Sequence, residues 1–298
     1  MSRRGALLFA AMCVIWGIPY LLIKVAVEDL SPSMLVLART TIAALILLPI
    51  ALARRELRPL LPHWLPLLAF AAIEIALPWV LLGAAETEIS SSLTGLLIAT
   101  VPLVATVIAL TTGDRERPAL QTALGLLLGL IGVAAIVGVT VEGASVVPIV
   151  EVTLVAVCYA VGPVILQRWL AGLPALGVIT ASLSVTAVAY VPIVALGSAG
   201  QAPSVKAAGA VLGLAVVCTA LAFLLFFALI TEVGPVRATV ITYVNPAMAA
   251  LLGVAILDEH FTLGMGVGFA LVLTGSVLAT RPGIARKAAR RPALDAAS

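Results

Sequence analysis

The sequence predicts an all-α integral membrane protein with ten transmembrane helices, arranged as two inverted five-helix repeats. Three observations predict it: an apolar composition, an uneven distribution of basic residues and an internal repeat. Hydrophobic residues make up 62% of the 298 residues and charged residues only 10%, against about 25% in soluble domains. Few aromatic residues and abundant Leu, Ala, Val and Gly favour helices over an outer-membrane barrel, whose strands alternate with period two.

Ten apolar runs have the length of about 20 residues that crosses a bilayer as a helix. We expect them near 5–27, 32–53, 64–85, 91–112, 119–139, 146–167, 175–197, 207–230, 236–257 and 261–280. The first run continues to Ala26, which is too long for the core of a signal peptide, so it is interpreted as a retained span.

The basic residues predict which way the spans run. With a cytoplasmic N-terminus, fourteen of the seventeen Lys and Arg residues fall inside, Lys206 falls outside, and Lys24 and Arg39 lie within spans. The inside set is Arg3, Arg4, Arg54, Arg55, Arg58, Arg115, Arg117, Arg168, Arg237, Arg281, Arg286, Lys287, Arg290 and Arg291. Cytoplasmic loops of membrane proteins carry this excess of basic residues. We therefore expect a multi-pass protein of the plasma or inner membrane with both termini cytoplasmic, and no role in binding nucleic acid.

An internal repeat predicts two halves. A shift of 143 residues superposes Trp16 on Tyr159, Lys24 on Gln167, Pro49 on Pro192, Gly125 on Gly268 and Gly132 on Gly275; a shift of 144 superposes Pro102 on Pro246 and Asp114 on Asp258. The predicted units are a repeat over 1–143, a repeat over 144–282 and a basic cytoplasmic tail over 283–298. Five spans are an odd number, so the second half enters the membrane from the opposite side. Inverted repeats of this kind recur in secondary transporters, with the substrate site near mid-membrane between the halves.

Four ionisable residues lie within the predicted spans: Lys24, Arg39, Glu74 and Glu151. Each would cost about 2.5–3.5 kcal/mol facing lipid at mid-membrane, so they should face the interior, pair or reach an interface. Glu74 is the first candidate for a coupling proton site, because burial favours the neutral form of a carboxyl group, or for a contact to a cationic substrate. The alternative is a buried ion pair of Glu74 with Lys24 or Arg39.

The other three charged residues have structural alternatives. Lys24 can extend its ammonium to the interface. Arg39 can tie helices together or bind an anion. Glu151 is the second candidate for coupling, or it reaches toward the outer interface.

Aromatic and polar residues suggest where a substrate cavity lies. Trp16, Tyr20 and Lys24 share one face of the first span, and Pro19 there would free a backbone carbonyl. Packing with an ordinary kink is the alternative. Further candidates for the cavity are Trp79, Tyr159, Tyr243 and Asn245, and candidates for hinges are Pro19, Pro102 and Pro246. Asn245 could equally hydrogen-bond across helices.

No arrangement of residues predicts an enzyme. The sequence has no phosphate-binding glycine loop, no metal-ligand cluster and no nucleophile with a base, so we expect no catalytic residue, no cofactor and no metal. Cys13, Cys158 and Cys218 lie in apolar runs and are interpreted as packing residues. Small-residue faces at Gly125/Gly129 and Gly264/Gly268 predict close helix packing, either within the chain or in a homodimer.

Several motifs together resemble the EamA family of the drug/metabolite transporter superfamily. They are Trp16-Gly17 followed by Lys24, then Pro32 and Arg39, the stretch Ala99-Thr100-Val101-Pro102-Leu103 leading to Gly113-Asp114, and Asn245-Pro246 leading to Leu257-Asp258-Glu259. The resemblance covers residues 5–282. It implies an exporter of amino acids, other small metabolites or drugs, driven by exchange or an ion gradient, with a cavity between spans 1, 3, 4, 6, 8 and 9. Glu74 matches no motif of the family, so its role depends on burial alone.

Three functions follow from these observations, in decreasing order of support. The first is a secondary transporter, an exporter of small metabolites such as amino acids or drugs by alternating access, whose partners are a small-molecule substrate, the lipid bilayer and a proton or exchange counter-substrate. The second is an organophosphate or nucleotide-sugar antiporter of the same fold, for which only Lys24 and Arg39 offer positive charge. The third is a membrane protein that does not transport.

Overall fold

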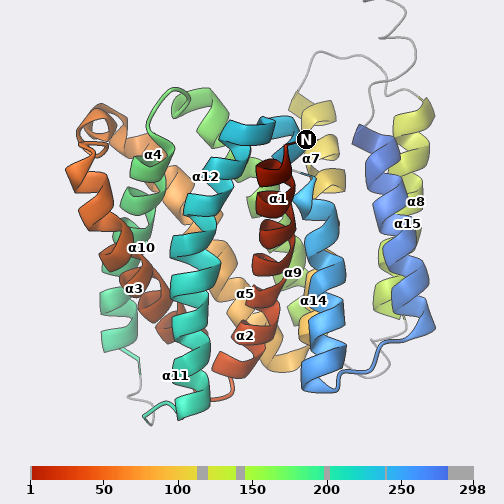
Figure 1. The fold of residues 1–298 in the computed structure, drawn as a ribbon. Coiled ribbons are helices and arrows are strands. Elements are labelled where there is room, and N and C mark those ends of the chain that lie inside the picture. Colours follow the sequence, from red (N-terminus) through yellow and green to blue (C-terminus); the bar gives the residue numbers. More distant parts are fainter. Residues whose placement is uncertain (1, 113–119, 139–144, 198–201, 239, 281–298) are drawn as a thin grey trace, which may run out of the picture.

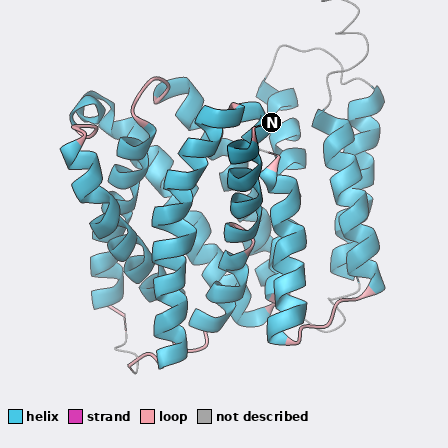
Figure 2. Cartoon of the chain, viewed as in Figure 1, coloured by secondary structure: helices cyan, strands magenta, loops and turns pink. Residues whose placement is uncertain are grey.

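The structure is a computed structural model that describes residues 2–112, 120–138, 145–197, 202–238 and 240–280. Within these ranges every regular element is a helix (Figure 2). Nine helical segments of the described chain are long and apolar enough to cross a membrane: Arg3–Ala26, Pro32–Ala53, Arg58–Glu88, Ser91–Thr111, Leu120–Gly138, Val147–Trp169, Ala175–Ala195, Val205–Val233 and Leu263–Thr280. A shorter apolar helix, Ile241–Leu257, has 17 residues. At about 1.5 Å per residue it spans roughly 26 Å, close to the thickness of the hydrocarbon core.

Two spans are broken where proline prevents a continuous helix. The first span consists of α1 (Arg3–Ile15) and α2 (Ile18–Ala26), and the fourth of α6 (Ser91–Ile98) and α7 (Val101–Thr112). Proline lacks an N–H, and its ring clashes with the carbonyl four residues earlier. Ile15 precedes Pro19 by four residues and Ile98 precedes Pro102 by four, so α1 and α6 end where this clash falls. Pro246, in contrast, lies inside the continuous α14 (Ile241–Leu257), which follows the short α13 (Pro235–Ala238).

Two other spans each contain a π-helical segment. The third span runs through η1 (Arg58–His63), α4 (Trp64–Phe70), the π-helix η2 (Ala71–Ala76) and α5 (Leu77–Glu88). The eighth runs through α11 (Val205–Leu212), the π-helix η3 (Gly213–Leu221) and α12 (Ala222–Val233). Adding 143 to 71–76 gives 214–219, which lies inside η3. Such π-helical turns are rare and often occur at functional sites.

The remaining spans are single helices: α3 (Pro32–Ala53), α8 (Leu120–Gly138), α9 (Val147–Trp169), α10 (Ala175–Ala195) and α15 (Leu263–Thr280). Helices from the two sequence halves pack against each other throughout the bundle: α3 against α10, α5 against α9, α1 against α12, α6 against α14 and α8 against α15. The pair of α8 and α15 stands at one edge of the molecule (Figure 1). Its glycines face inward, since a Cβ at Gly125 or Gly132 would meet the backbone of α15. These small residues therefore serve packing within the chain.

Large apolar side chains cover much of the outer surface, including Leu45, Leu65, Val188 and Leu196, each more than 60% exposed. Such a surface suits a hydrocarbon environment, as the composition requires. The predicted loop Asp114–Arg117 and the predicted tail 283–298 lie outside the described residues.

Candidate functional site

Glu74 lies in η2 and faces α9. A Cβ at Gly162 of α9 would overlap the Glu74 carboxylate, so the two helices approach closely at this point. The Oε2 atom of Glu74 is buried and has no hydrogen-bond partner among the described residues. No described cation lies within ion-pairing distance of it, so the predicted alternative of an ion pair with Lys24 or Arg39 is not formed. Glu74 is thus a carboxyl group placed at a helix contact between the two sequence halves.

Backbone geometry explains the position of Glu74. Pro78 cannot donate to the Glu74 carbonyl four residues earlier, and the Leu77 N–H instead bonds to the carbonyl of Ala72, five residues earlier. The Ala76 carbonyl accepts a hydrogen bond from the Tyr190 hydroxyl of α10 at 2.9 Å. The widened turn therefore keeps its backbone bonded while it directs Glu74 toward α9.

Arg39 of α3 is bonded rather than free. Its side chain is 6% exposed, and its Nε donates to the Thr219 hydroxyl of η3 at 2.9 Å. Its guanidinium carbon lies 3.6 Å above the centre of the Trp79 ring, a cation–π contact. Thr219 in turn donates to the Leu214 carbonyl, five residues earlier in the π-helix. Arg39 therefore joins the two π-helical spans through Trp79 on one side and Thr219 on the other.

Two tyrosines complete this region. Tyr20 is 8% exposed, and Tyr159 lies within electrostatic reach of Glu74, Arg39 and Trp79. Tyr20 lies within the same reach of Tyr159 and Arg39. We call the set Arg39, Glu74, Trp79, Tyr159 and Thr219 the central cluster. Four of its five members were expected from the sequence, and Thr219 was not.

Lys24 bonds to the end of a neighbouring helix. Its ammonium donates to the carbonyls of Glu86 at 2.6 Å and Ile89 at 2.9 Å, at the C-terminal end of α5. A cation suits the negative end of the helix dipole. Lys24 thus caps the C-terminal end of α5.

Glu86 lies beside this cap and was missed by the sequence analysis. Its side chain is fully buried, and neither carboxylate oxygen has a partner among the described residues. The predicted third span ended at 85, whereas the helix continues to Glu88. Hydropathy places the end of a span where charge begins, and so it assigned Glu86 to a loop.

Glu259 also contributes an unexpected contact. Its two carboxylate oxygens accept from the Ser91 and Ser92 N–H groups, at 2.7 and 2.8 Å, at the N-terminus of α6. We call Lys24, Glu86, Ser91, Ser92 and Glu259 the α5–α6 corner. No local pattern in the sequence indicates that the turn containing Glu259 caps a helix 167 residues away.

Three predicted residues lie away from the central cluster. Trp16 packs edge-on against Phe223 and tilted against Phe226 of α12, at centroid distances of 6.0 and 4.7 Å. The Tyr243 hydroxyl lies 3.5 Å from that of Thr280. Glu151 is partly exposed and lies within electrostatic reach of Glu88. The ring contacts of Trp16 with Phe223 and Phe226 agree better with the packing alternative than with a cavity wall.

Asn245 has a buried side-chain oxygen without a described partner, so the hydrogen bond across helices is not observed for that atom. Three hydroxyls of α10 share this property: Thr180, Ser182 and Thr186. The sequence analysis missed them, because Ser and Thr are common in apolar helices and give no signal of their own.

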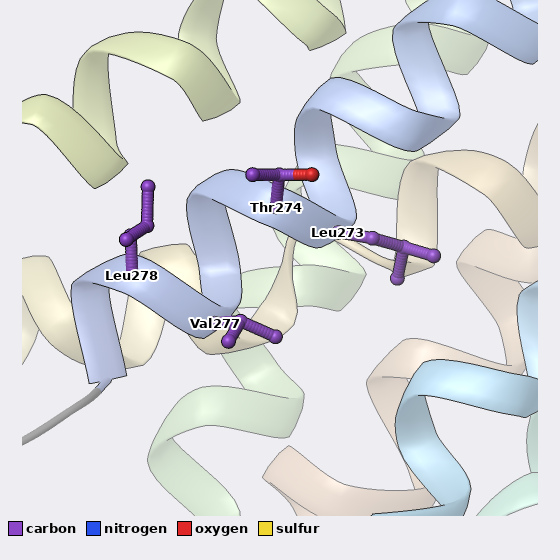
Figure 3. A pocket seen from close by; sticks show the side chains of 4 residues that line it. All are labelled: Leu273, Thr274, Val277 and Leu278. Carbon is purple, nitrogen blue, oxygen red and sulfur yellow. The ribbon is translucent and has the colours of Figure 1, made fainter.

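The described hollows lie on α15, away from the central cluster. One is lined by Leu273, Thr274, Val277 and Leu278 (Figure 3). The Thr274 hydroxyl donates to the Ala270 carbonyl of its own helix, so this hollow offers a ligand little polarity. The other is lined by Phe261, Thr262, Leu263, Gly266, Val267 and Ala270. Among the described residues no group of His, Cys, Asp or Glu could hold a metal ion, and the cysteines are free and buried.

Comparison with known proteins agrees with this architecture. The EamA-like transporter family matches residues 3–138 and again 148–281. The uncharacterized inner membrane transporter YedA of Escherichia coli K12 is 30% identical over 276 residues, 88% of each chain. The uncharacterized transporter YvbV of Bacillus subtilis is 26% identical over 296 residues, 97% of this chain and 95% of that one. A solved crystal structure with 21% identity has the same fold, with a TM-score of 0.66 over 94% of this chain and 97% of the other. The chain is a multi-pass membrane transporter and belongs to the EamA-like transporter family.

Proposed function

We propose that the protein is a secondary exporter of small metabolites, such as amino acids or drugs, that works by alternating access between its two halves. The single observation that carries the proposal is the placement of Glu74. It stands in a π-helical turn, against Gly162 of the other half, with a buried oxygen that has no described partner. A membrane-embedded carboxyl group in this position is suited to bind and release a proton.

A change in the charge of Glu74 would act at the contact between η2 and α9, and this is the basis of the proposed coupling role. An ionised carboxylate without partners is costly in a low-dielectric interior, so the closed contact with α9 favours the neutral form of Glu74. Opening the contact would admit water and favour the ionised form. Proton binding and the contact between the halves are then linked, which is the requirement for driving transport with a proton gradient.

The mixed aromatic and polar side chains of the central cluster support a metabolite or drug as substrate. The central cluster offers aromatic rings and hydroxyls, and its cation Arg39 is already engaged with Thr219 and Trp79. The other cation within the spans, Lys24, bonds to two carbonyls at the α5–α6 corner. An organophosphate would need such cations to be available. The organophosphate antiporter is therefore the weaker candidate.

The membrane and the orientation are part of the same proposal. The name of the E. coli relative places that protein in the inner membrane. With the positive-inside distribution, we propose an inner-membrane location with both termini cytoplasmic and the α5–α6 corner at the outer face. The 143-residue shift, the two matched stretches and the paired π-helices support two inverted repeats.

The test begins with untargeted metabolite profiles, inside and outside, of cells with and without the protein. The metabolite that accumulates inside cells lacking the protein is then used in proteoliposomes with an imposed proton gradient. We expect gradient-driven uptake or counterflow by the wild type and its loss in Glu74→Gln, while Glu151→Gln serves as the matched control and stays active. Undiminished proton-driven transport by Glu74→Gln would overturn the coupling role.

A further inference from the structure

The α5–α6 corner contains a buried acid that the proposed transport cycle does not use. Lys24 caps the C-terminal end of α5. Glu259 caps the N-terminal end of α6, which begins after a turn of two residues. Glu86 lies between the two caps, fully buried, with both carboxylate oxygens unpartnered in the described chain. It is within electrostatic reach of both Lys24 and Glu259.

The charges around Glu86 balance only when it is neutral. Glu259 accepts two backbone N–H bonds at a helix N-terminus, where the helix dipole favours a negative charge. Lys24 supplies one positive charge, so the corner is balanced if Glu86 carries a proton. An ionised Glu86 would add a second buried negative charge, and neither of its carboxylate oxygens accepts a hydrogen bond from a described residue.

Other titratable groups near α5 act on different residues. On the packed elements, Glu151 of α9 lies within electrostatic reach of Glu88, Glu74 of η2 within reach of Tyr159, and Arg39 of α3 within reach of Tyr20 and Tyr159. Tyr20 of α2 faces Glu86 as well, and its neutral hydroxyl adds no charge. Helix α6 carries no ionisable side chain. Lys24 and Glu259 are thus the charged groups that act on Glu86.

We propose that Glu86 is a proton-binding site whose charge state controls the contact between the Glu259 turn and α6. Release of the proton leaves a carboxylate that repels Glu259 and attracts the Lys24 ammonium, which has three donors and uses two on backbone carbonyls. The hydrogen bonds from Lys24 to the α5 carbonyls and those from the α6 N–H groups to Glu259 weaken together, because the first cap is drawn toward Glu86 and the second is repelled by it. Glu259 and α6 belong to different sequence halves, so losing this contact separates the halves at this end of the bundle.

The test measures this separation directly and needs neither a substrate nor transport. Spin labels are attached at Thr87 and Leu263, both exposed, on either side of the contact, after the three buried cysteines are replaced by alanine. Double electron–electron resonance in lipid nanodiscs gives the label distance from pH 5 to pH 9. We expect one short distance at low pH and a growing longer distance as the pH rises and Glu86 loses its proton.

Three variants separate Glu86 from its neighbours. Glu86→Gln resembles the protonated acid and should keep the short distance at every pH. Glu259→Gln should show the longer distance even at low pH, and Glu151→Gln should behave as the wild type. A wild type without pH dependence, or a Glu86→Gln variant that keeps the wild-type change, would overturn the proposal. Because the distance is measured without transport, failure of the transport proposal leaves this result unaffected.

Discussion

The two π-helical segments occupy corresponding positions in the two halves and carry opposite chemistry. In η2 the turn presents Glu74, whose buried oxygen has no described partner. In η3 the corresponding region presents Thr219, which accepts from Arg39 and donates to Leu214. Both segments are π-helical, but η2 holds an acid with an unpartnered oxygen and η3 holds a hydroxyl that both accepts and donates a hydrogen bond. This comparison suggests that η3 anchors the bundle and that η2 is the segment that changes during transport.

The largest effect should come from filling the space beside η2. A Cβ in Gly162→Ala would overlap the Glu74 carboxylate, so the Glu74 side chain must leave its position against α9. We expect transport to fall more than tenfold in proteoliposomes, the scale of a displacement of about 1 Å at a functional site. Gly209→Ala is the control, since a Cβ there meets nothing within 4 Å. If Gly162→Ala transports normally, η2 does not work as a closely packed element.

The second effect should come from removing the anchor at η3. Arg39→Met would lose a hydrogen bond to Thr219 and a cation–π contact with Trp79. We expect about 2–4 kcal/mol of destabilisation from these two contacts. The measurement is the thermal midpoint of the detergent-solubilised protein, followed by size-exclusion chromatography. Thr219→Val should cost less, about 1–2 kcal/mol, since it removes the hydrogen bond and keeps the ring contact. Equal losses in both variants would contradict this division.

A smaller effect should follow from uncapping α5. Lys24→Met would leave the carbonyls of Glu86 and Ile89 without their donor while keeping most of the apolar stem. We expect about 1–2 kcal/mol of destabilisation, from two lost hydrogen bonds partly replaced by water at this end of the helix. The thermal midpoint again reports it. Lys206→Met, which removes an exposed ion pair with Glu28, is the control and should leave the midpoint nearly unchanged.

The smallest effect concerns an exposed contact at the same end of the bundle. Asp29 accepts a hydrogen bond from the Ser204 N–H at 2.9 Å, and hydrogen bonding to Ser204 lowers the pKa of Asp29. A lowered pKa means that the contact is present at neutral pH and is lost as the pH falls below the usual range of an aspartate. Asp29→Asn should therefore shift the thermal midpoint slightly at pH 7, and this shift should fade as the pH falls and Asp29 takes up a proton. A shift that grows toward acid pH would contradict the direction.

Much of the fold followed from the sequence because hydropathy reports which segments lie in lipid. The spans at 32–53 and 175–197 agree with α3 and α10 to within two residues. Pro19 and Pro102 were recognisable as breaks because proline acts on its own helix. The π-helices were not, since their hydrogen bonds depend on neighbours such as Tyr190 of α10. The ends of spans were also uncertain, and this uncertainty hid Glu86.

The central cluster was predicted in part, and the reason is physical. A charged residue in an apolar run must find an environment, so Arg39 and Glu74 were visible in the sequence. Which environment each one finds depends on residues far along the chain. Thr219 reaches Arg39 across 180 residues, and Gly162 faces Glu74 from another helix.

The sequence by itself therefore determined the membrane character, the number of spans within one and the residues that lipid would not tolerate. Only the tertiary structure decided which of these residues are satisfied. Lys24 and Arg39 became helix contacts, whereas Glu74 and Glu86 were left buried without described partners. Hydropathy depends on the lipid surroundings, which the residues of a span share. Hydrogen bonds require a partner within about 3 Å, and that distance is set only when the helices pack.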